Sequence, residues 1–497
     1  MEKYFVGVDL GTGSTKAVAI NTAGNTLATA QSYYPTSNPQ PGYSEQNPEL
    51  IWRAFVDCIS KITTNLNAAP AAISFSSAMH SILPVDKQGT ALADAMLWAD
   101  ARSGKIAQAI RESADGEKLY KHTGTAIYAM SPFCKLIWLR QNEPQLFNNA
   151  FKFISIKEYV WFKLFGVFEV DYSIASAMGM FDVLGLRWYD KALAICGVTA
   201  DKLSIPVNTN HKRYITSTGI LPGVSAETAF IIGASDGCCA NLGGNAVRPG
   251  IGALTIGTSG AVRVGSKAPV YNYEAMTFNY LLNANTFICG GAVNNGGAAV
   301  DWLLKDFLKL ETVSAQSYES LFKSIDTVKP GSDGLVFLPY LYGERAPVWD
   351  AKGAGAFINI NFKHQRQHFL RAALEGICFA LNNVLSAVEN TAEPIKEIVI
   401  SGGFITSATW VQMLADITGK KLVLLQGGDS SAMGAIYLAM EALGVDITRI
   451  IINEATDRVE IMPNAEAHNI YNKMFPIYKK LYGQIKSSVH ELYDISN

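Results

Sequence analysis

Short apolar runs rich in Val and Ile alternate along this chain with longer stretches in which apolar residues recur every three or four positions. Such runs are typical of buried strands, and the longer spacing is typical of amphipathic helices. Residues 6–20 are interpreted as two short strands joined by a Gly-rich turn, and residues 71–76 as another strand. Helices are expected over residues 48–63, 158–165, 300–309, 368–389 and 409–418. This alternation predicts an α/β architecture.

One hairpin pattern occurs twice. The sequence VDLGTGS at residues 8–14 returns as LTIGTSG at residues 254–260, each time between two apolar strands. A hairpin repeated at the start of each half predicts two related domains. We place their boundary in the stretch 243–250, which contains Gly and Pro. The expected domains are therefore 1–244 and 245–497.

Composition and charge exclude several classes of protein. The chain of 497 residues is too long for one core, and its formal net charge is -2 with no dense run of Lys or Arg. We therefore expect no nucleic-acid partner. No uninterrupted apolar run approaches the roughly 18–20 residues that span a bilayer, and residues 1–6 lead directly into a strand pattern. A cytoplasmic protein with no membrane association is expected, and the chain is compatible with a homodimer.

Both repeated turns combine residues that suit a polyphosphate. Gly residues let backbone N–H groups approach closely, and Thr or Ser adds a hydroxyl. Asp9 lies just before the first turn, where its carboxylate is a candidate to hold a hydrated Mg²⁺ ion. The alternative is that each turn is an ordinary tight hairpin. The candidate phosphate-binding residues are Gly11, Thr12, Gly13, Ser14 and Lys16 in the first half, and Gly257, Thr258 and Ser259 in the second.

Several motifs resemble one family. Residues 9–16 (DLGTGSTK) resemble the first phosphate loop of the FGGY carbohydrate kinases, and residues 130–139 (MSPFCKLIWL) resemble the first signature of that family. Residues 355–375 resemble the second signature, although Asn359 stands where that signature has Gly. The resemblance implies two related domains of the actin and hexokinase (ribonuclease H-like) fold with an interdomain cleft. It also implies ATP and Mg²⁺ as cofactors, with the sugar and the catalytic base bound in domain 1–244 and the nucleotide in domain 245–497.

The segment Gly233 to Gly237 resembles the one that carries the catalytic base of the family. Phosphoryl transfer requires a carboxylate within hydrogen-bond reach of the attacking hydroxyl. From the residues alone, Asp236 at the start of a small-residue helix is more often an N-cap. The resemblance instead implies that Asp236 contacts the substrate and accepts its proton.

Three later segments are implied to contact the nucleotide. Asn295 and Gly296 lie in the run GGAVNNGG, and Gly402 and Gly403 follow an apolar strand. Residues 430–435 resemble the helix start that flanks the adenosine in the family. Close packing of helix on strand is the alternative for each segment.

The substrate side is expected in the first domain. Residues 77–81 (SAMHS) resemble the sugar-contact loop of the family, and residues 97–103 (LWADARS) resemble its neighbour. A sugar needs an apolar or aromatic wall and a few fixed polar groups. Met79 and Trp98 suit the wall, and His80, Asp100 and Arg102 suit the hydroxyls. The alternatives are a buried, satisfied His80 and a local ion pair between Asp100 and Arg102.

Within the family, residues 79–81, 98–103, 292–297 and 343–347 resemble the gluconate kinases. This resemblance implies transfer of the ATP γ-phosphoryl group to the terminal hydroxyl of a sugar acid, D-gluconate. Arg102 is a candidate partner for the gluconate carboxylate. Xylulose is the alternative substrate. An alternative of another class is a non-catalytic, nucleotide-switched sugar sensor on the same fold.

Overall fold

The computed structural model describes residues 3–216, 218–309, 322–389, 394–425, 429–448, 450 and 458–496. The chain forms two compact units. The first comprises Met1–Val247, Ser266–Ile288 and Gly427–Thr456, and the second comprises Arg248–Gly265, Cys289–Gln426 and Asp457–Asn497. The sequence predicts one cut between residues 244 and 245, whereas two later segments join the first unit.

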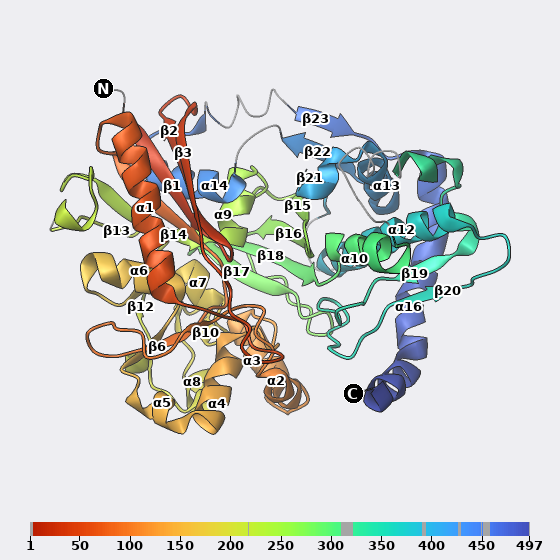
Figure 1. Cartoon of the computed structure of the whole chain (residues 1–497), viewed down its shortest axis with the longest axis horizontal. Coiled ribbons are helices and arrows are strands. Elements are labelled where there is room, and N and C mark those ends of the chain that lie inside the picture. Colours follow the sequence, from red (N-terminus) through yellow and green to blue (C-terminus); the bar gives the residue numbers. More distant parts are fainter. Residues whose placement is uncertain are drawn as a thin grey trace. The chain divides into compact units, whose positions relative to one another are not determined.

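The first unit is built on a six-stranded sheet in the order β13-β14-β5-β1-β2-β3 (Figure 1). Its strands are β1 (Tyr4–Leu10), β2 (Ser14–Asn21), β3 (Thr26–Tyr33), β5 (Ala72–Ser77), β13 (Lys212–Arg213) and β14 (Ala229–Ser235). β1 pairs antiparallel with β2 and parallel with β5, and β5 pairs parallel with β14. The strands β1, β5 and β14 therefore end at the same edge of the sheet.

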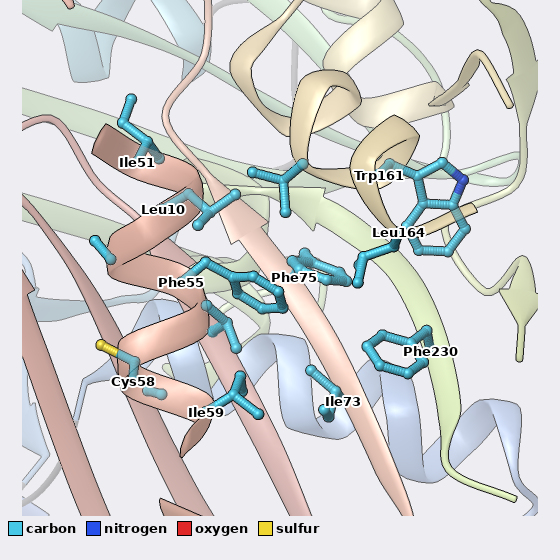
Figure 2. Packing of buried hydrophobic residues seen from close by; sticks show 14 of the residues in the cluster. Leu10, Ile51, Phe55, Cys58, Ile59, Ile73, Phe75, Trp161, Leu164 and Phe230 are labelled. Atoms are coloured by element: carbon cyan, nitrogen blue, oxygen red, sulfur yellow. The ribbon is translucent and has the colours of Figure 1, made fainter. Parts of the chain in front are cut away.

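Alternate residues of this sheet face two separate layers of core. Val6 and Val8 of β1 face the layer formed by α1 (Pro48–Leu66) and α6 (Ile156–Phe165). Figure 2 shows Phe55 of α1, Phe75 of β5 and Trp161 of α6 packed together in this layer. The ring centroids of Phe55 and Phe75 lie 5.4 Å apart, and those of Phe75 and Trp161 lie 6.0 Å apart. These aromatic contacts hold α1 and α6 against one face of the sheet.

The other face is covered by α9 (Asp236–Gly243) and α14 (Ser430–Ala442). Phe5 of β1 and Val18 of β2 pack with these helices. Strands covered on both faces are expected to be apolar at nearly every position, as β1 is. The late helix α14 therefore completes the core of the first unit.

The first unit contains further short elements. Its other helices are α2 (Gly104–Arg111), α3 (Gly116–Thr123), α4 (Pro132–Asn142), α5 (Pro144–Asn149), α7 (Tyr172–Ser176) and α8 (Asp190–Cys196). Its other strands are β4 (Glu45–Gln46), β6 (Leu83–Val85), β7 (Ala95–Met96), β8 (Lys152–Ile154), β9 (Glu169–Asp171), β10 (Phe181–Asp182), β11 (Arg187–Trp188), β12 (Ile205–Val207) and β17 (Phe278–Asn283).

The second unit repeats the sheet of the first. Its strands follow the order β18-β16-β15-β21-β22-β23, and β15 pairs antiparallel with β16 and parallel with β21. β21 pairs parallel with β22, and β22 pairs antiparallel with β23. These directions match those around β1, with β15 in its place. The predicted fold of two related actin/hexokinase-like α/β domains is confirmed.

The elements of the second unit are β15 (Ile251–Ile256), β16 (Gly260–Ser266), β18 (Thr286–Val293), β19 (Val336–Leu338), β20 (Ala356–Ile358), β21 (Glu397–Ser401), β22 (Lys421–Leu425), β23 (Arg458–Ile461), α10 (Gly297–Trp302), α12 (Arg366–Glu389), α13 (Ala408–Thr418) and α16 (Ala465–Ser496). Within the described residues, α12 is the one helix long and apolar enough to cross a membrane by length and composition. Because 78% of its apolar stretch is buried inside the protein, it has the character of a core helix.

Gly233 allows β14 to lie against β5. The pairing of these strands shifts register between Ile231 and Ala234, and Gly233 adopts φ +70° within the shift. A Cβ atom at this position would lie 1.9 Å from the carbonyl oxygen of Phe75. The bulge thus sets the direction in which β14 delivers the residues that follow it.

We predict that Gly233→Ala destabilises the protein more than Gly166→Ala does. Gly166 also has a positive φ, +66°, but a Cβ there would meet nothing within 4 Å. Its replacement should cost about 1–2 kcal/mol, the usual penalty for an L-residue in the left-handed region. Gly233→Ala adds a backbone collision to that strain. Urea unfolding followed by circular dichroism measures both losses, and equal losses would contradict the steric explanation.

Candidate active site

Three chemically important segments meet at the carboxyl edge of the first sheet. Asp9 lies opposite Ser76 in the pairing of β1 and β5, and Ser76 lies opposite Ala234 in the pairing of β5 and β14. The loop after β5 contains the half-buried Met79, and Asp236 follows β14 directly. Ligands of open α/β sheets bind at this edge. The predicted phosphate, sugar and base segments of the first unit are thus brought together.

The first predicted phosphate turn is hydrogen-bonded to a residue of the predicted sugar wall. The N–H of Gly11 closes the turn by donating to the carbonyl of Ser14 at 3.1 Å. The indole Nε1 of Trp98 donates to Oγ1 of Thr12 at 3.1 Å. A Cβ on Gly13 would meet nothing within 4 Å, so the tip of the turn is open. Trp98, predicted for the sugar wall, therefore also contacts the phosphate turn.

Asp9 lies among other carboxylates. The hydroxyl of Ser76 donates to its Oδ1 at 2.7 Å. The pKa of Asp9 is raised to about 7, mainly by burial and in addition by the charges of Asp236 and Asp429, while the hydrogen bond from Ser76 and the charge of Lys16 lower it. In the described part of the chain, no three His, Cys, Asp or Glu side chains are grouped so as to hold a metal ion by themselves. Asp9 therefore stays a prediction as an oxygen ligand for a hydrated ion.

Lys16 forms an ion pair in the structure. Its Nζ lies 3.2 Å from Oδ2 of Asp429. The Oδ1 of Asp429 accepts the backbone N–H groups of Ser431 and Ala432 and so caps α14. Residues 430–435, predicted to flank the adenosine, begin this helix and pack in the first unit. The sequence analysis missed Asp429, although an Asp just before a small-residue helix is a start signal.

Asp236 begins α9 but does not cap it. The N-cap is Ser235, whose hydroxyl oxygen accepts the N–H of Cys238 at 3.4 Å. The Oδ1 of Asp236 accepts the N–H of Gly237 at 2.6 Å. The alternative that Asp236 is the helix cap is therefore wrong.

His80 is buried and satisfied by hydrogen bonds. Its Nδ1 lies 2.9 Å from the carbonyl of Ala177, which can only accept, so Nδ1 carries the proton. Its Nε2 lies 3.2 Å from the hydroxyl of Tyr280. The buried Nζ of Lys135 donates to the carbonyls of His80 and Leu97, at 2.7 and 2.5 Å. This loop is therefore fixed in place, and Lys135 joins the two sugar-side segments.

Asp100 and Arg102 form the local ion pair that the sequence left as an alternative. Nη2 of Arg102 lies 2.7 Å from Oδ2 of Asp100 and 2.5 Å from Oε1 of Glu45. The guanidinium carbon lies 3.7 Å from the ring centroid of Tyr43 and 5.0 Å from that of Trp138. The Arg102 side chain is 8% exposed. These contacts direct the guanidinium into the protein.

The second predicted phosphate turn accepts hydrogen bonds from the backbone at the start of α10. The N–H of Gly257 donates to the carbonyl of Ser259 at 2.9 Å and closes the turn. The N–H of Gly296 donates to the carbonyl of Thr258, and that of Gly297 to the carbonyl of Gly257, at 3.1 and 2.7 Å. A Cβ on Gly296 would lie 2.7 Å from the carbonyl oxygen of Ser259. Gly296 therefore lets α10 begin directly against the turn.

A pocket of about 800 Å³ opens beside this turn, within the second unit. Among the predicted nucleotide residues, Gly257, Thr258 and Gly403 line it, together with the starts of α10 and α13. The aromatic side chains of Phe404 and Trp410 form part of its wall. This volume suits a nucleoside, since pockets of about 300–1,000 Å³ enclose ligands of drug size.

Asn295 and Gly402 contact the backbone close to the second turn. Asn295 is fully buried, and its Nδ2 donates to the carbonyl of Gly343 at 2.8 Å and to Glu344 at 3.0 Å. Gly402 adopts φ +106°, and a Cβ there would lie 2.1 Å from the carbonyl of Ile256. Both residues thus shape the backbone around the second turn.

Family models match both halves of the chain. The N-terminal domain of the FGGY family of carbohydrate kinases matches residues 4–243, and the C-terminal domain of that family matches residues 252–443. The chain belongs to the FGGY family of carbohydrate kinases. The kinase is accordingly an ATP-dependent enzyme that acts on a sugar.

Full-length relatives agree with this assignment. The kinase is 38% identical to a gluconokinase of Bacillus licheniformis, over 97% of this chain and 96% of that protein. Crystal structures of a gluconate kinase and of a ligand-bound xylulose kinase, both from Lactobacillus acidophilus, superpose with a TM-score of 0.93 at 30% identity. Each superposition includes 99% of this chain and 100% of the other chain.

We predict that Arg102→Ala lowers the free energy of unfolding by about 3–5 kcal/mol, because it leaves a buried carboxylate without its partner. Lys61→Ala breaks the exposed pair with Asp57 and should cost far less, because exposed ion pairs contribute little to stability. Urea unfolding measures both. A variant Arg102→Ala of unchanged stability but raised KM for the sugar would show that Arg102 serves the substrate rather than the fold.

Proposed function

We propose that this kinase transfers the γ-phosphoryl group of ATP to the terminal hydroxyl of D-gluconate and forms 6-phosphogluconate. The support is the 38% identity to a gluconokinase over nearly the whole chain. The predicted sugar-side segments 79–81 and 98–103 also resemble those of gluconate kinases. Xylulose is the second candidate substrate, since a xylulose kinase structure matches as well as a gluconate kinase structure does.

Asp236 is the proposed base. The observation that supports it is the common edge of β1, β5 and β14, which brings Asp236 beside Asp9 and the Met79 loop. Ser235 already caps α9, so the Asp236 carboxylate is not needed for that purpose. In the proposed reaction it accepts the proton of the attacking hydroxyl as that oxygen bonds to the γ-phosphorus and ADP leaves. Positioning and charge neutralisation dominate such a transfer.

Residues for phosphate and metal binding are proposed at the same carboxyl edge of the first sheet. The open turn from Gly11 to Ser14 and the exposed side of Lys16 are proposed to contact phosphate oxygens. Asp9 suits a hydrated Mg²⁺ ion, because that ion prefers oxygen ligands and keeps several waters. Burial and, to a smaller extent, the neighbouring charges of Asp236 and Asp429 raise the pKa of Asp9, and a divalent cation would relieve the repulsion between these carboxylates. When bound, the ion neutralises charge on the phosphates.

On the sugar side, Met79 and the exposed face of Trp98 are proposed as the apolar wall. His80 fixes the loop, since both of its ring nitrogens are hydrogen-bonded within the protein. The guanidinium of Arg102 is buried against Asp100 and Glu45. Arg102 is therefore not proposed as the partner of the gluconate carboxylate.

We predict that gluconate gives the highest kcat/KM in an ADP-release assay over gluconate, sorbitol, xylulose, ribulose and glycerol. Sorbitol has a hydroxymethyl group in place of the gluconate carboxylate, so the ratio of the two values measures recognition of that charge. Phosphorus NMR of the product should show coupling to two protons, as expected for a phosphate on a terminal carbon. A stronger response to xylulose would reverse the choice of substrate. No response to any of the five would contradict sugar phosphorylation.

We predict that Asp236→Asn lowers kcat by a factor of about 10²–10⁴, the usual contribution of a general base. Binding of ATP, measured by calorimetry, should be retained because the fold and the phosphate turns are unchanged. Asp190→Asn is the matched control, since Asp190 is likewise the first residue of a helix, α8, but is exposed. Near-normal turnover of Asp236→Asn would remove this residue from the mechanism.

A further inference from the structure

A buried ion pair lies beside the end of β14 and has no part in the proposed reaction. Nζ of Lys157 lies 2.8 Å from Oδ2 of Asp171, and the two side chains are 3% and 1% exposed. The same Nζ donates to the carbonyl oxygen of Ala234 at 3.0 Å. Lys157 thus anchors the backbone two residues before Asp236.

A buried serine holds the next residue. The hydroxyl of Ser173 donates to Oγ of Ser235 at 2.8 Å and accepts the backbone N–H of Ser235 at 3.0 Å. Ser173 is itself fixed by α7, whose N-cap is Asp171; the Oδ1 of Asp171 accepts the N–H of Ile174 at 2.9 Å. Asp171 therefore connects the lysine contact and the serine contact.

Both contacts fall where the backbone would otherwise be weakly defined. The register shift of β14 and the positive φ of Gly233 lie immediately before Ala234. Ser235 must also stay in place as the N-cap of α9. Tethers on Ala234 and Ser235 set the position and direction from which the Asp236 side chain extends.

We propose that Lys157, Asp171 and Ser173 are positioning residues for the base Asp236, an inference that rests on the proposed function of that carboxylate. Stability alone explains the ion pair poorly, because a buried pair is often no better than apolar residues of similar volume. A displacement of about 1 Å at a reacting group, in contrast, can lower the rate about a hundredfold. The network acts on the rate through the geometry of Asp236.

The test measures kcat and KM for Ser173→Ala in the full-length enzyme. We expect kcat to fall about tenfold or more while both KM values change less than about twofold, because the substrates bind but the base is misplaced. Thr228→Val is the matched control. Thr228 is a buried residue whose hydroxyl donates to the carbonyl of Pro70 at 2.8 Å, at the opposite end of β14. Equal loss of kcat in both variants would mean a general packing effect and overturn the inference.

A second pair of variants separates the geometry from the buried charge. Lys157→Met leaves Asp171 unpaired and is expected to lower the melting temperature. The double variant Lys157→Met with Asp171→Asn removes both charges but keeps an oxygen to cap α7. We expect the double variant to recover stability while kcat stays low, because the Ala234 carbonyl is still released. Recovery of kcat together with stability would overturn the role of Lys157 in positioning.

Failure of this inference can be told from failure of the base assignment. If Asp236→Asn is inactive while Ser173→Ala has the kcat of the natural enzyme, the positioning role fails and the base stands. If Asp236→Asn turns over normally, the base assignment itself fails. In the Asp236→Asn background, Ser173→Ala should produce no further loss. A full additional loss in that background would show that Ser173 does not act through Asp236.

Discussion

The close approach of α9, α14 and β1 in the first unit is the constraint on which the site depends. A Cβ on Gly7 would lie 2.0 Å from the carbonyl of Ala432, and one on Gly434 would lie 2.0 Å from the carbonyl of Cys239. Only glycine permits this distance between backbones. As a result, α9 and α14 both begin beside Asp9, and their positive ends face the edge where anionic phosphates are proposed to bind.

The two hairpins that are similar in sequence lie in sheets with matching strand directions, and a side-chain hydrogen bond also recurs at corresponding positions. Asp9 accepts the hydroxyl of Ser76, and the corresponding Thr255 is hydrogen-bonded to Ser401 at 2.9 Å. The fold could be predicted because both hairpins and their flanking strands leave local patterns. The sequence also shows one difference between the two halves. A carboxylate, Asp9, precedes the first turn, whereas Thr255 takes the corresponding place before the second. This asymmetry agrees with the proposal that the first unit supplies the base and the metal ligand and that the second unit binds the nucleoside.

The sequence does not show which hydrogen-bond and ion-pair partners a candidate site residue receives from distant segments of the chain. Arg102 looked available to a substrate, but Glu45 and Trp138, far away in the chain, enclose its guanidinium. Asn295 looked like a nucleotide ligand because it lies in a Gly-rich run, yet it holds the backbone around Glu344. For Asp236 the obstacle was local: two adjacent residues can both cap a helix, and only the structure shows that Ser235 does so. Such competition is decided by geometry that composition and spacing do not encode.

The position of α14 in the chain has a consequence for biosynthesis. The strands of the first sheet are all synthesised before residue 248, whereas the helix that covers one face of them comes from residues 430–442. During translation α9 is available to this apolar face early, but the part that α14 covers stays exposed until residues 430–442 have been made. The amino-terminal half alone therefore cannot complete the core of the first unit, and ribosome-bound chains expose a surface that a chaperone can hold. The unit that is begun first is completed only after most of the second unit has been made.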